Sequence, residues 1–228
     1  MRHANHLVVF VKAPRLGAVK RRLAADIGAV CATAFYRRTL ASVLARLRRD
    51  RRWRLSLAVT PDRDAWRSGF WPDRLHRIPQ GTGDLGKRIA RVMAAMPPGP
   101  VVVVGSDVPD LDIGHVAPAF HALGRADAVF GPAPDGGYWL VGLKRRRPLP
   151  GLFDAVRWST EHALCDTLAN LPPGASVAFI ETLEDIDDGA AFARWRASRS
   201  PAKSTLRPDH GRPRSPPATR RPRESGHS

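Results

Sequence analysis

Cysteine, lysine and long apolar runs are all scarce in this chain of 228 residues. Its two cysteines, Cys31 and Cys165, are too few and too far apart for a disulfide framework or a zinc site. We therefore expect a protein of the reducing cytoplasm, with both cysteines packed within helices. There is no apolar run of about 18 residues or more, so the sequence predicts no membrane span.

Acidic residues are also few, with 21 against 37 basic ones and a net charge of +16. Such an excess can indicate nucleic-acid binding. However, only five of the basic residues are lysines. The many arginines occur with abundant alanine and proline, a composition that a GC-rich coding bias also produces. We therefore expect no nucleic-acid partner.

The last part of the chain differs in composition from the rest. Residues 200–228 are rich in proline and carry seven basic residues against two acidic ones, with almost no large apolar side chain. Such a segment buries too little surface to offset its ordering entropy, so we expect a disordered basic tail. Residues 1–199 then form one folded domain.

Within residues 1–199, short apolar runs alternate with segments of helical periodicity. Strands are predicted at 7–11, 54–60, 75–78, 101–104, 128–131, 138–143 and 177–180. Helices are predicted around 36–47 and at 84–96, 113–123, 159–171 and 188–197, the fourth capped by Ser159 or Thr160. This alternation predicts an α/β fold, with a mostly parallel but mixed sheet and helices on both faces.

The strand at 101–104 leads directly into Gly105-Ser106-Asp107, and Asp110 follows three residues later. Ligands of open α/β sheets bind at the carboxyl ends of strands, where Asp107 could hold a divalent metal against phosphates. The alternative is that Asp107 or Asp110 caps the following helix.

The loop after the first strand is basic. Pro14 and Gly17 shape its turn, while Lys12, Lys20 and Arg22 could close around a di- or triphosphate. No acidic residue lies between the two lysines, which favours a phosphate over an internal salt bridge as their partner. The alternative is a solvated basic loop.

Three further stretches carry polar residues beside turn or helix signals. Gly83-Asp84-Leu85-Gly86 would allow a close ligand approach, or Asp84 would simply cap a helix. Asp135 precedes two glycines and could project into a cleft, or serve only a hairpin turn. The acidic run at 184–188 could complete a site, or only stabilise the start of the last helix.

Several short motifs in a fixed order carry a resemblance to a known family. They are Lys12-x-Pro14-x-x-Gly17-x-x-Lys20, Gly83-Asp84-Leu85-Gly86, Gly105-Ser106-Asp107-x-Pro109-Asp110-Leu111, Asp135-Gly136-Gly137-Tyr138, Trp158-Ser159-Thr160 and Asp185-Ile186-Asp187. With them the chain resembles the radical-SAM/selenodomain-associated glycosyltransferase-like family of the GT-A superfamily, from about Leu7 to Trp195. That family is similar to the phospholactate guanylyltransferases and, more remotely, to the molybdenum-cofactor nucleotidyltransferases.

The resemblance implies a GT-A, Rossmann-like domain that binds a nucleotide or a nucleotide-sugar. It implies metal ligation by Asp107 and Asp187, phosphate contact by Lys12 and Lys20, and an acceptor-side role for Asp135. The chain departs from the family at two places, with Arg21 in place of the usual threonine and Asp188-Gly189 in place of Thr-Pro.

Together these observations predict a transferase that uses a nucleotide-activated donor, a small-molecule acceptor and Mg²⁺ or Mn²⁺. Glycosyl transfer is the first expectation, and nucleotidyl transfer or non-catalytic nucleotide binding are the alternatives. Asp135, as a base, and Lys20, through its charge, are the expected catalytic residues. The expected nucleotide-binding residues are Lys12, Pro14, Gly17, Lys20, Arg22, Gly83, Asp84, Gly86 and Ser106.

Overall fold

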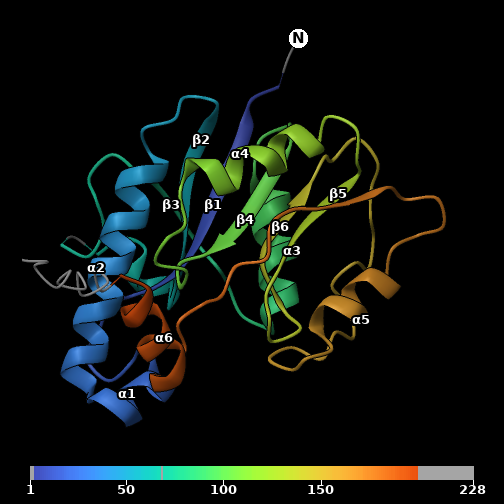
Figure 1. The fold of residues 1–228 in the computed structure, drawn as a ribbon. Helices are drawn as coiled ribbons and strands as arrows, with labels where there is room; N and C mark the ends of the chain where they lie inside the picture. Colours follow the sequence, from blue (N-terminus) through green and yellow to red (C-terminus); the bar gives the residue numbers. More distant parts are fainter. Residues whose placement is uncertain (1–2, 68, 200–228) are drawn as a thin grey trace, which may run out of the picture.

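The computed structural model describes residues 3–67 and 69–199, and the predicted tail lies outside these residues. Seven strands form one sheet in the order β3-β2-β1-β4-β6-β5-β7. Their bounds are β1 (Asn5–Lys12), β2 (Trp53–Thr60), β3 (His76–Pro79), β4 (Val101–Gly105), β5 (Ala128–Pro132), β6 (Tyr138–Leu143) and β7 (Val177–Phe179). Figure 1 shows the sheet at the centre of the molecule.

The sheet is mixed, as the sequence predicts. The strands β3, β2, β1 and β4 are mutually parallel, so their carboxyl ends meet at one edge of the sheet. The strand β6 pairs antiparallel with both β4 and β5, and β5 pairs parallel with β7. The register pairs Phe10 with Gly105, which brings the loop after β4 beside the end of β1.

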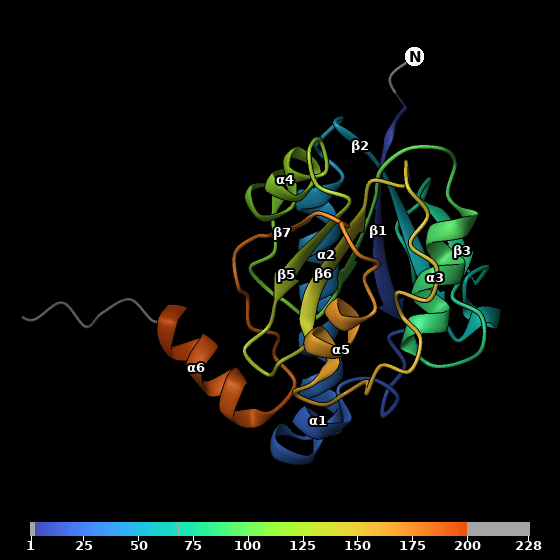
Figure 2. The ribbon, with the colours of Figure 1, turned by 90° about the vertical axis from the view of Figure 1, so that its right-hand side faces the viewer.

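Helices cover both faces of the sheet, which confirms the predicted fold class. They are α1 (Arg21–Ile27), α2 (Ala29–Leu47), α3 (Leu85–Ala95), α4 (Ile113–Ala122), α5 (Ala163–Ala169) and α6 (Gly189–Arg199). Figure 2 shows α3 on the opposite side of the sheet from α4. The strands β1 and β4 are apolar at consecutive positions because both of their faces are covered.

Two hydrophobic cores result, one on each face. The first lies under α2 and α4 and takes the apolar stripe of α2, which includes Leu40, Val43 and Leu44. The second lies under α3 and holds Ile89 and Val92. The spacing of three and four residues in both helices follows from the helical repeat, which is why the sequence predicts them.

Two local expectations are wrong. The helix predicted at 159–171 begins only at Ala163, because Ser159 has a φ of 62° and His162 precedes the first turn without a side-chain cap. Thr160 instead donates its hydroxyl hydrogen to the carbonyl of Arg157 in the preceding turn. Cys31 and Cys165 do lie on helices, but both are exposed rather than packed.

Candidate active site at the carboxyl edge of the sheet

The loop that leaves β1 is fixed to α2 and to the loop after β4. The buried hydroxyl of Tyr36 accepts a hydrogen bond from the backbone amide of Lys12 and donates one to the backbone carbonyl of Lys12, both at 2.9 Å. The same hydroxyl lies 3.4 Å from Ser106 Oγ. Burial raises the pKa of Tyr36, so this phenol stays protonated and serves as a structural clamp.

Two distant acidic segments meet beyond β4. The backbone amide of Ile186 donates to the carbonyl of Asp107 at 3.1 Å, and the buried side chain of Ile186 anchors the segment 184–188 there. This places Asp187 beside Asp107, the two residues that the resemblance pairs as metal ligands.

The side chain of Lys20 lies between these two carboxylates. Its ammonium is 2.8 Å from Asp107 Oδ1 and donates a hydrogen bond to Asp187 Oδ1 at 3.0 Å. Asp107 Oδ1 is buried, and the ammonium of Lys20 is its close charged contact. The expectation that Lys20 forms no internal salt bridge is therefore wrong. The sequence near Lys20 could not show this, because both partners come from remote segments.

The pKa of Lys20 reflects two opposing effects. Burial would lower it, since only 3% of the side chain is exposed, but the charges of Asp107 and Asp187 outweigh burial and raise it. Lys20 is therefore a charged ammonium in this structure.

A third carboxylate, Asp185, belongs to the same cluster. Burial raises its pKa to about 6, and the negative charges of Asp187, Asp107 and Asp135 add to this effect against the opposing charge of Lys20. From the sequence, Asp185 belongs to the Asp185-Ile186-Asp187 motif and to the acidic run at 184–188, but it is not among the predicted site residues.

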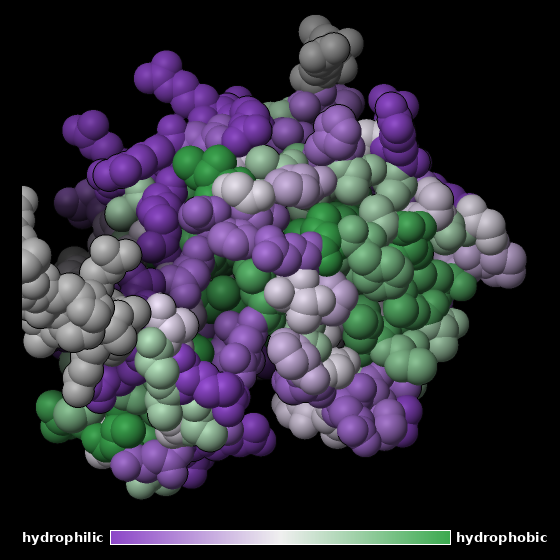
Figure 3. Space-filling model, viewed as in Figure 1, coloured by the Kyte–Doolittle hydropathy of each residue, from purple (hydrophilic) through white to green (hydrophobic). Residues whose placement is uncertain are grey.

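Lys20, Asp107 and Asp187 line one cavity of about 420 Å³ at the carboxyl ends of the parallel strands, whereas Asp185 and Asp135 are not among its lining residues. Six of the predicted site residues are among its walls, as are Tyr36, Thr60, Gln80 and Arg21, which the sequence analysis did not select. The six are Lys12, Lys20, Arg22, Ser106, Asp107 and Asp187. Figure 3 shows the molecule hollowed between the part that carries α6 and the part that carries α5, with hydrophilic residues on the walls.

Pro14 and Gly17 shape the basic loop from outside this cavity. The carbonyl of Pro14 accepts two hydrogen bonds from the guanidinium of Arg37, at 2.9 and 3.2 Å. Gly17 has a φ of 70°, which glycine adopts without steric cost. Their predicted nucleotide contact stays a prediction.

The glycine-rich stretch lies at the start of α3 and does not line the cavity. Asp84 caps the helix by accepting a hydrogen bond from the amide of Lys87 at 2.8 Å. A Cβ at Gly86 would lie 2.6 Å from the carbonyl oxygen of Phe153, so close packing requires glycine there. The alternative role of Asp84 is thus present, and nucleotide binding by Gly83, Asp84 and Gly86 stays a prediction.

Asp135 lies in the turn between β5 and β6 and is exposed. One of its carboxylate oxygens accepts a hydrogen bond from the amide of Gly137 at 2.9 Å. This is the turn geometry that the sequence analysis gave as the alternative role. The negative charge of Asp135 also contributes to the raised pKa of Asp185, so the two carboxylates interact electrostatically.

Gln80 is a further residue that sequence reasoning missed. Its buried side chain donates to the carbonyls of Val11 and Ala58 at 3.3 and 2.8 Å, and accepts from Arg88 at 2.9 Å. It ties the ends of β1 and β2 together under the cavity. A polar residue directly after a strand was the only available signal.

Comparison with known proteins places the chain in a family. Residues 43–160 match the model of the family described as "Uncharacterized protein conserved in bacteria (DUF2064)". The chain belongs to the DUF2064 family. A search of curated proteins found no match.

Solved structures agree with the fold of this DUF2064 chain. A Desulfovibrio desulfuricans G20 protein, provisionally described as a nucleotide-diphospho-sugar transferase, is 28% identical, with a TM-score of 0.77 over 87% of this chain and 89% of that one. This likeness confirms the GT-A-like fold that the sequence motifs predict.

Two more distant structures share the fold alone. The 4-diphosphocytidyl-2C-methyl-D-erythritol synthase of Anaerococcus prevotii DSM 20548 is 12% identical, with a TM-score of 0.56 over 86% and 97% of the two chains. Rv0371c of Mycobacterium tuberculosis H37Rv, in complex with manganese, is 14% identical, with a TM-score of 0.50 over 84% and 98%.

The donor groups at Asp107 and Asp187 suit a hard divalent cation, because carboxylate oxygens are the ligands that Mg²⁺ and Mn²⁺ prefer. Within the described part of the chain, no group of three or more acidic, histidine or cysteine side chains is arranged to hold a metal. Mg²⁺ is commonly held by one or two carboxylates together with substrate phosphates and water. The pair therefore fits a metal that is completed by a phosphate ligand. Among residues 3–67 and 69–199, no helix is long and apolar enough to cross a membrane.

Proposed function

We propose that this protein is a transferase that uses a nucleotide-activated donor and a divalent metal. One observation carries the proposal. The cations Lys12, Lys20 and Arg22 and the carboxylates Asp107 and Asp187 line the same cavity, at the carboxyl edge where α/β folds bind ligands. The cations can bind the donor phosphates, and the carboxylates can bind the metal that neutralises the phosphate charge.

Each residue then has a stated task. Lys12 and Arg22 bind the donor phosphates, and Lys20 stabilises the charge that develops on the leaving phosphate. Asp107 and Asp187 would hold Mg²⁺ or Mn²⁺, which supplies Lewis-acid neutralisation of that phosphate charge when bound. The manganese complex of Rv0371c, which has the same fold, supports this choice of metal.

Asp135 is the proposed base. Its exposed carboxylate would accept the proton of an acceptor hydroxyl as that oxygen attacks the donor. The backbone amide of Gly137 holds the carboxylate in place, so little reorientation is needed. The acceptor is proposed to be a small molecule.

Glycosyl transfer from a nucleotide-sugar is the first choice, because the nucleotide-diphospho-sugar transferase described above has the higher identity, 28%. Nucleotidyl transfer from a nucleoside triphosphate is the second candidate. It is favoured by the four cationic side chains that line the cavity, namely Lys12, Lys20, Arg21 and Arg22. The family that the sequence motifs resemble is glycosyltransferase-like and is itself similar to the phospholactate guanylyltransferases.

A binding panel tests the proposal. Nucleoside diphosphate-sugars and nucleoside triphosphates are titrated calorimetrically into the full chain with Mn²⁺, and ligands that bind are incubated with candidate hydroxyl acceptors. We expect at least one nucleotide class to bind in a Mn²⁺-dependent manner. The product formed with an acceptor then identifies the transferred group. Failure of every nucleotide to bind, with and without Mn²⁺, would refute the proposal.

A further inference from the structure

The place of Lys20 between two carboxylates has a consequence for metal binding. Lys20 directly precedes α1 with a left-handed backbone, φ 50° and ψ 51°, a conformation that is uncommon for a residue with a side chain. Only 3% of its side chain is exposed, against 39% for Asp107 and 50% for Asp187. The lysine is thus the enclosed partner, whereas the two aspartate side chains are partly exposed, with Asp107 Oδ1 itself buried against the ammonium.

The ammonium stands where a bridging metal would stand. Its nitrogen lies 2.8 and 3.0 Å from one oxygen of each carboxylate, so a single cation spans the pair. A divalent metal held by the same two carboxylates would need the space between them, where carboxylate oxygens bind Mg²⁺ at about 2.0–2.1 Å. That position overlaps with the nitrogen of Lys20. The two cations therefore exclude one another.

A phosphate is the group that can remove Lys20 from this position. The wall of the cavity also carries Lys12, Arg21 and Arg22, so an anion that enters it meets four cations and two carboxylates. The ammonium can exchange its carboxylate partners for a phosphate oxygen, and the metal can then bridge the freed carboxylates to the same phosphate.

We propose that Lys20 is an exchangeable counter-ion that occupies the metal position between Asp107 and Asp187 in the free protein. Divalent metal enters only when the ammonium leaves, and nucleotide phosphate draws it away. The second step rests on the proposed function, whereas the exclusion of metal by Lys20 does not require a nucleotide. Metal and nucleotide therefore bind together rather than independently.

The test measures Mn²⁺ binding to the full chain without nucleotide, by calorimetry or by the electron paramagnetic resonance signal of free Mn²⁺. Lys20→Ala removes the competing cation and is expected to tighten Mn²⁺ binding by more than about tenfold, because two close carboxylates are left without a counter-charge. Lys12→Ala is the matched control. It removes one positive charge from the same cavity, but Lys12 contributes no ion pair to the two carboxylates.

We expect Lys12→Ala to change the Mn²⁺ affinity by less than about threefold, since solvent and salt screen a charge that makes no direct contact. Asp107→Ala in the Lys20→Ala background should abolish the gain and so locate the metal. Lys20→Met, which keeps most of the side-chain volume, replaces Lys20→Ala if circular dichroism shows that the alanine variant is unfolded.

Three results would overturn the inference. They are equal Mn²⁺ affinities of wild type and Lys20 variants, an equal gain in the Lys12 control, and no measurable binding in any variant. None of them depends on nucleotide binding. A failure of the proposed function, in which no nucleotide binds, is therefore recognised separately.

Discussion

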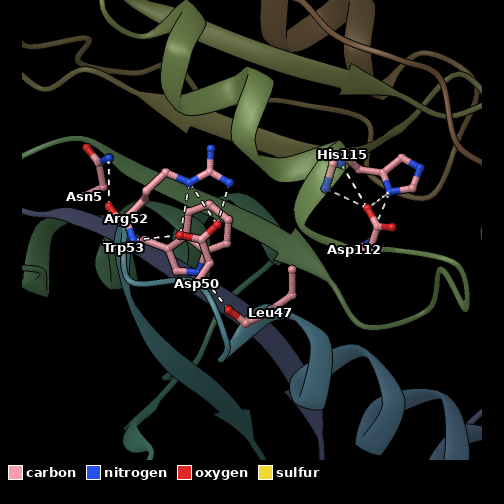
Figure 4. A network of polar contacts seen from close by, with 8 residues as sticks. Asn5, Leu47, Asp50, Arg52, Trp53, Asp112 and His115 are labelled. Atoms are coloured by element: carbon pink, nitrogen blue, oxygen red, sulfur yellow. Dashed lines mark hydrogen bonds and ion pairs between the residues drawn. The ribbon is translucent and has the colours of Figure 1, made fainter.

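The polar contacts at the carboxyl edge of the sheet differ in kind from two of the contacts in Figure 4. In Figure 4, Asp50 pairs with Arg52 two residues away, and Asp112 accepts from the amide of His115 three residues away. At the carboxyl edge, Lys20 and Asp187 are 167 positions apart. Contacts between residues two or three positions apart can form as soon as the local backbone is in place. The contact between Lys20 and Asp187 requires the complete tertiary fold.

The two regions also differ in the desolvation of their charged side chains. The Arg52 side chain is 59% exposed, so solvent screens its ion pair with Asp50, and the pair contributes little to stability. Lys20 is enclosed beside two carboxylates, and burial, followed by the charges of Asp187, Asp107 and Asp135, raises the pKa of the neighbouring Asp185. Buried charged groups with shifted pKa values cluster at ligand sites, which sets this region apart from a surface ion pair.

The largest expected effect comes from Asp107→Ala. Loss of this carboxylate should remove the Mn²⁺ dependence of nucleotide binding while the fold stays intact, because the residue lies in a loop after β4. Calorimetry with nucleotide and Mn²⁺ makes the measurement. Asp110→Ala is the control, since Asp110 pairs with Arg199 on α6 instead. Unchanged metal dependence in Asp107→Ala would contradict the assignment.

The second prediction concerns Lys20 as a phosphate ligand. Lys20→Ala should weaken metal-free nucleotide binding by well over tenfold, since loss of a buried charge partner costs about 2–5 kcal/mol. Binding of the matching nucleoside, which has no phosphate, should hardly change. If both ligands weaken equally, Lys20 supports the shape of the loop rather than the phosphate.

The third prediction uses the pKa of Asp185, which burial and neighbouring charges raise to about 6. Because the folded-state pKa is above the ordinary value, this group favours the folded protein below about pH 4, and that contribution is lost as the pH rises through 6. After allowance for partial exposure, the loss is about 1–2 kcal/mol. Urea unfolding in EDTA between pH 4 and pH 7 should show this loss of unfolding free energy, and the Asp185→Asn variant should not show it. If the free energy of unfolding depended on pH equally in the variant and the wild type, the prediction would be contradicted.

The smallest effect is expected in the region of Figure 4. Asp112 caps α4, accepting hydrogen bonds from the amides of Gly114 and His115 at 2.8 and 3.3 Å. Asp112→Ala should lower the free energy of unfolding by about 1 kcal/mol, the usual cost of a lost cap. Thermal melting measures this, and nucleotide affinity should stay at the wild-type value. A loss of affinity would mean that the two regions are coupled.

Much of the fold follows from local patterns. The consecutive valines of β4, the helical stripe of α2 and the capping aspartate of α3 all act within a few residues, so the sequence shows them directly. The start of α5 was predicted wrongly for the converse reason. Ser159 is a good capping residue type, but its left-handed backbone belongs to the turn after Trp158, whose side chain packs against the core under α3.

The candidate site divides in the same way. The sequence by itself determined which residue types are present: a basic loop after the first strand, an aspartate after the central strand and a late acidic run. Only the tertiary structure decided that Lys20 pairs with Asp107 and Asp187, that Tyr36 and Gln80 line the cavity, and that Gly86 packs against Phe153. The physical reason is the range of the interactions. Caps, turns and apolar periodicity depend on neighbours along the chain, whereas the partner of a buried charge is fixed by the arrangement of strands and helices that brings remote loops together.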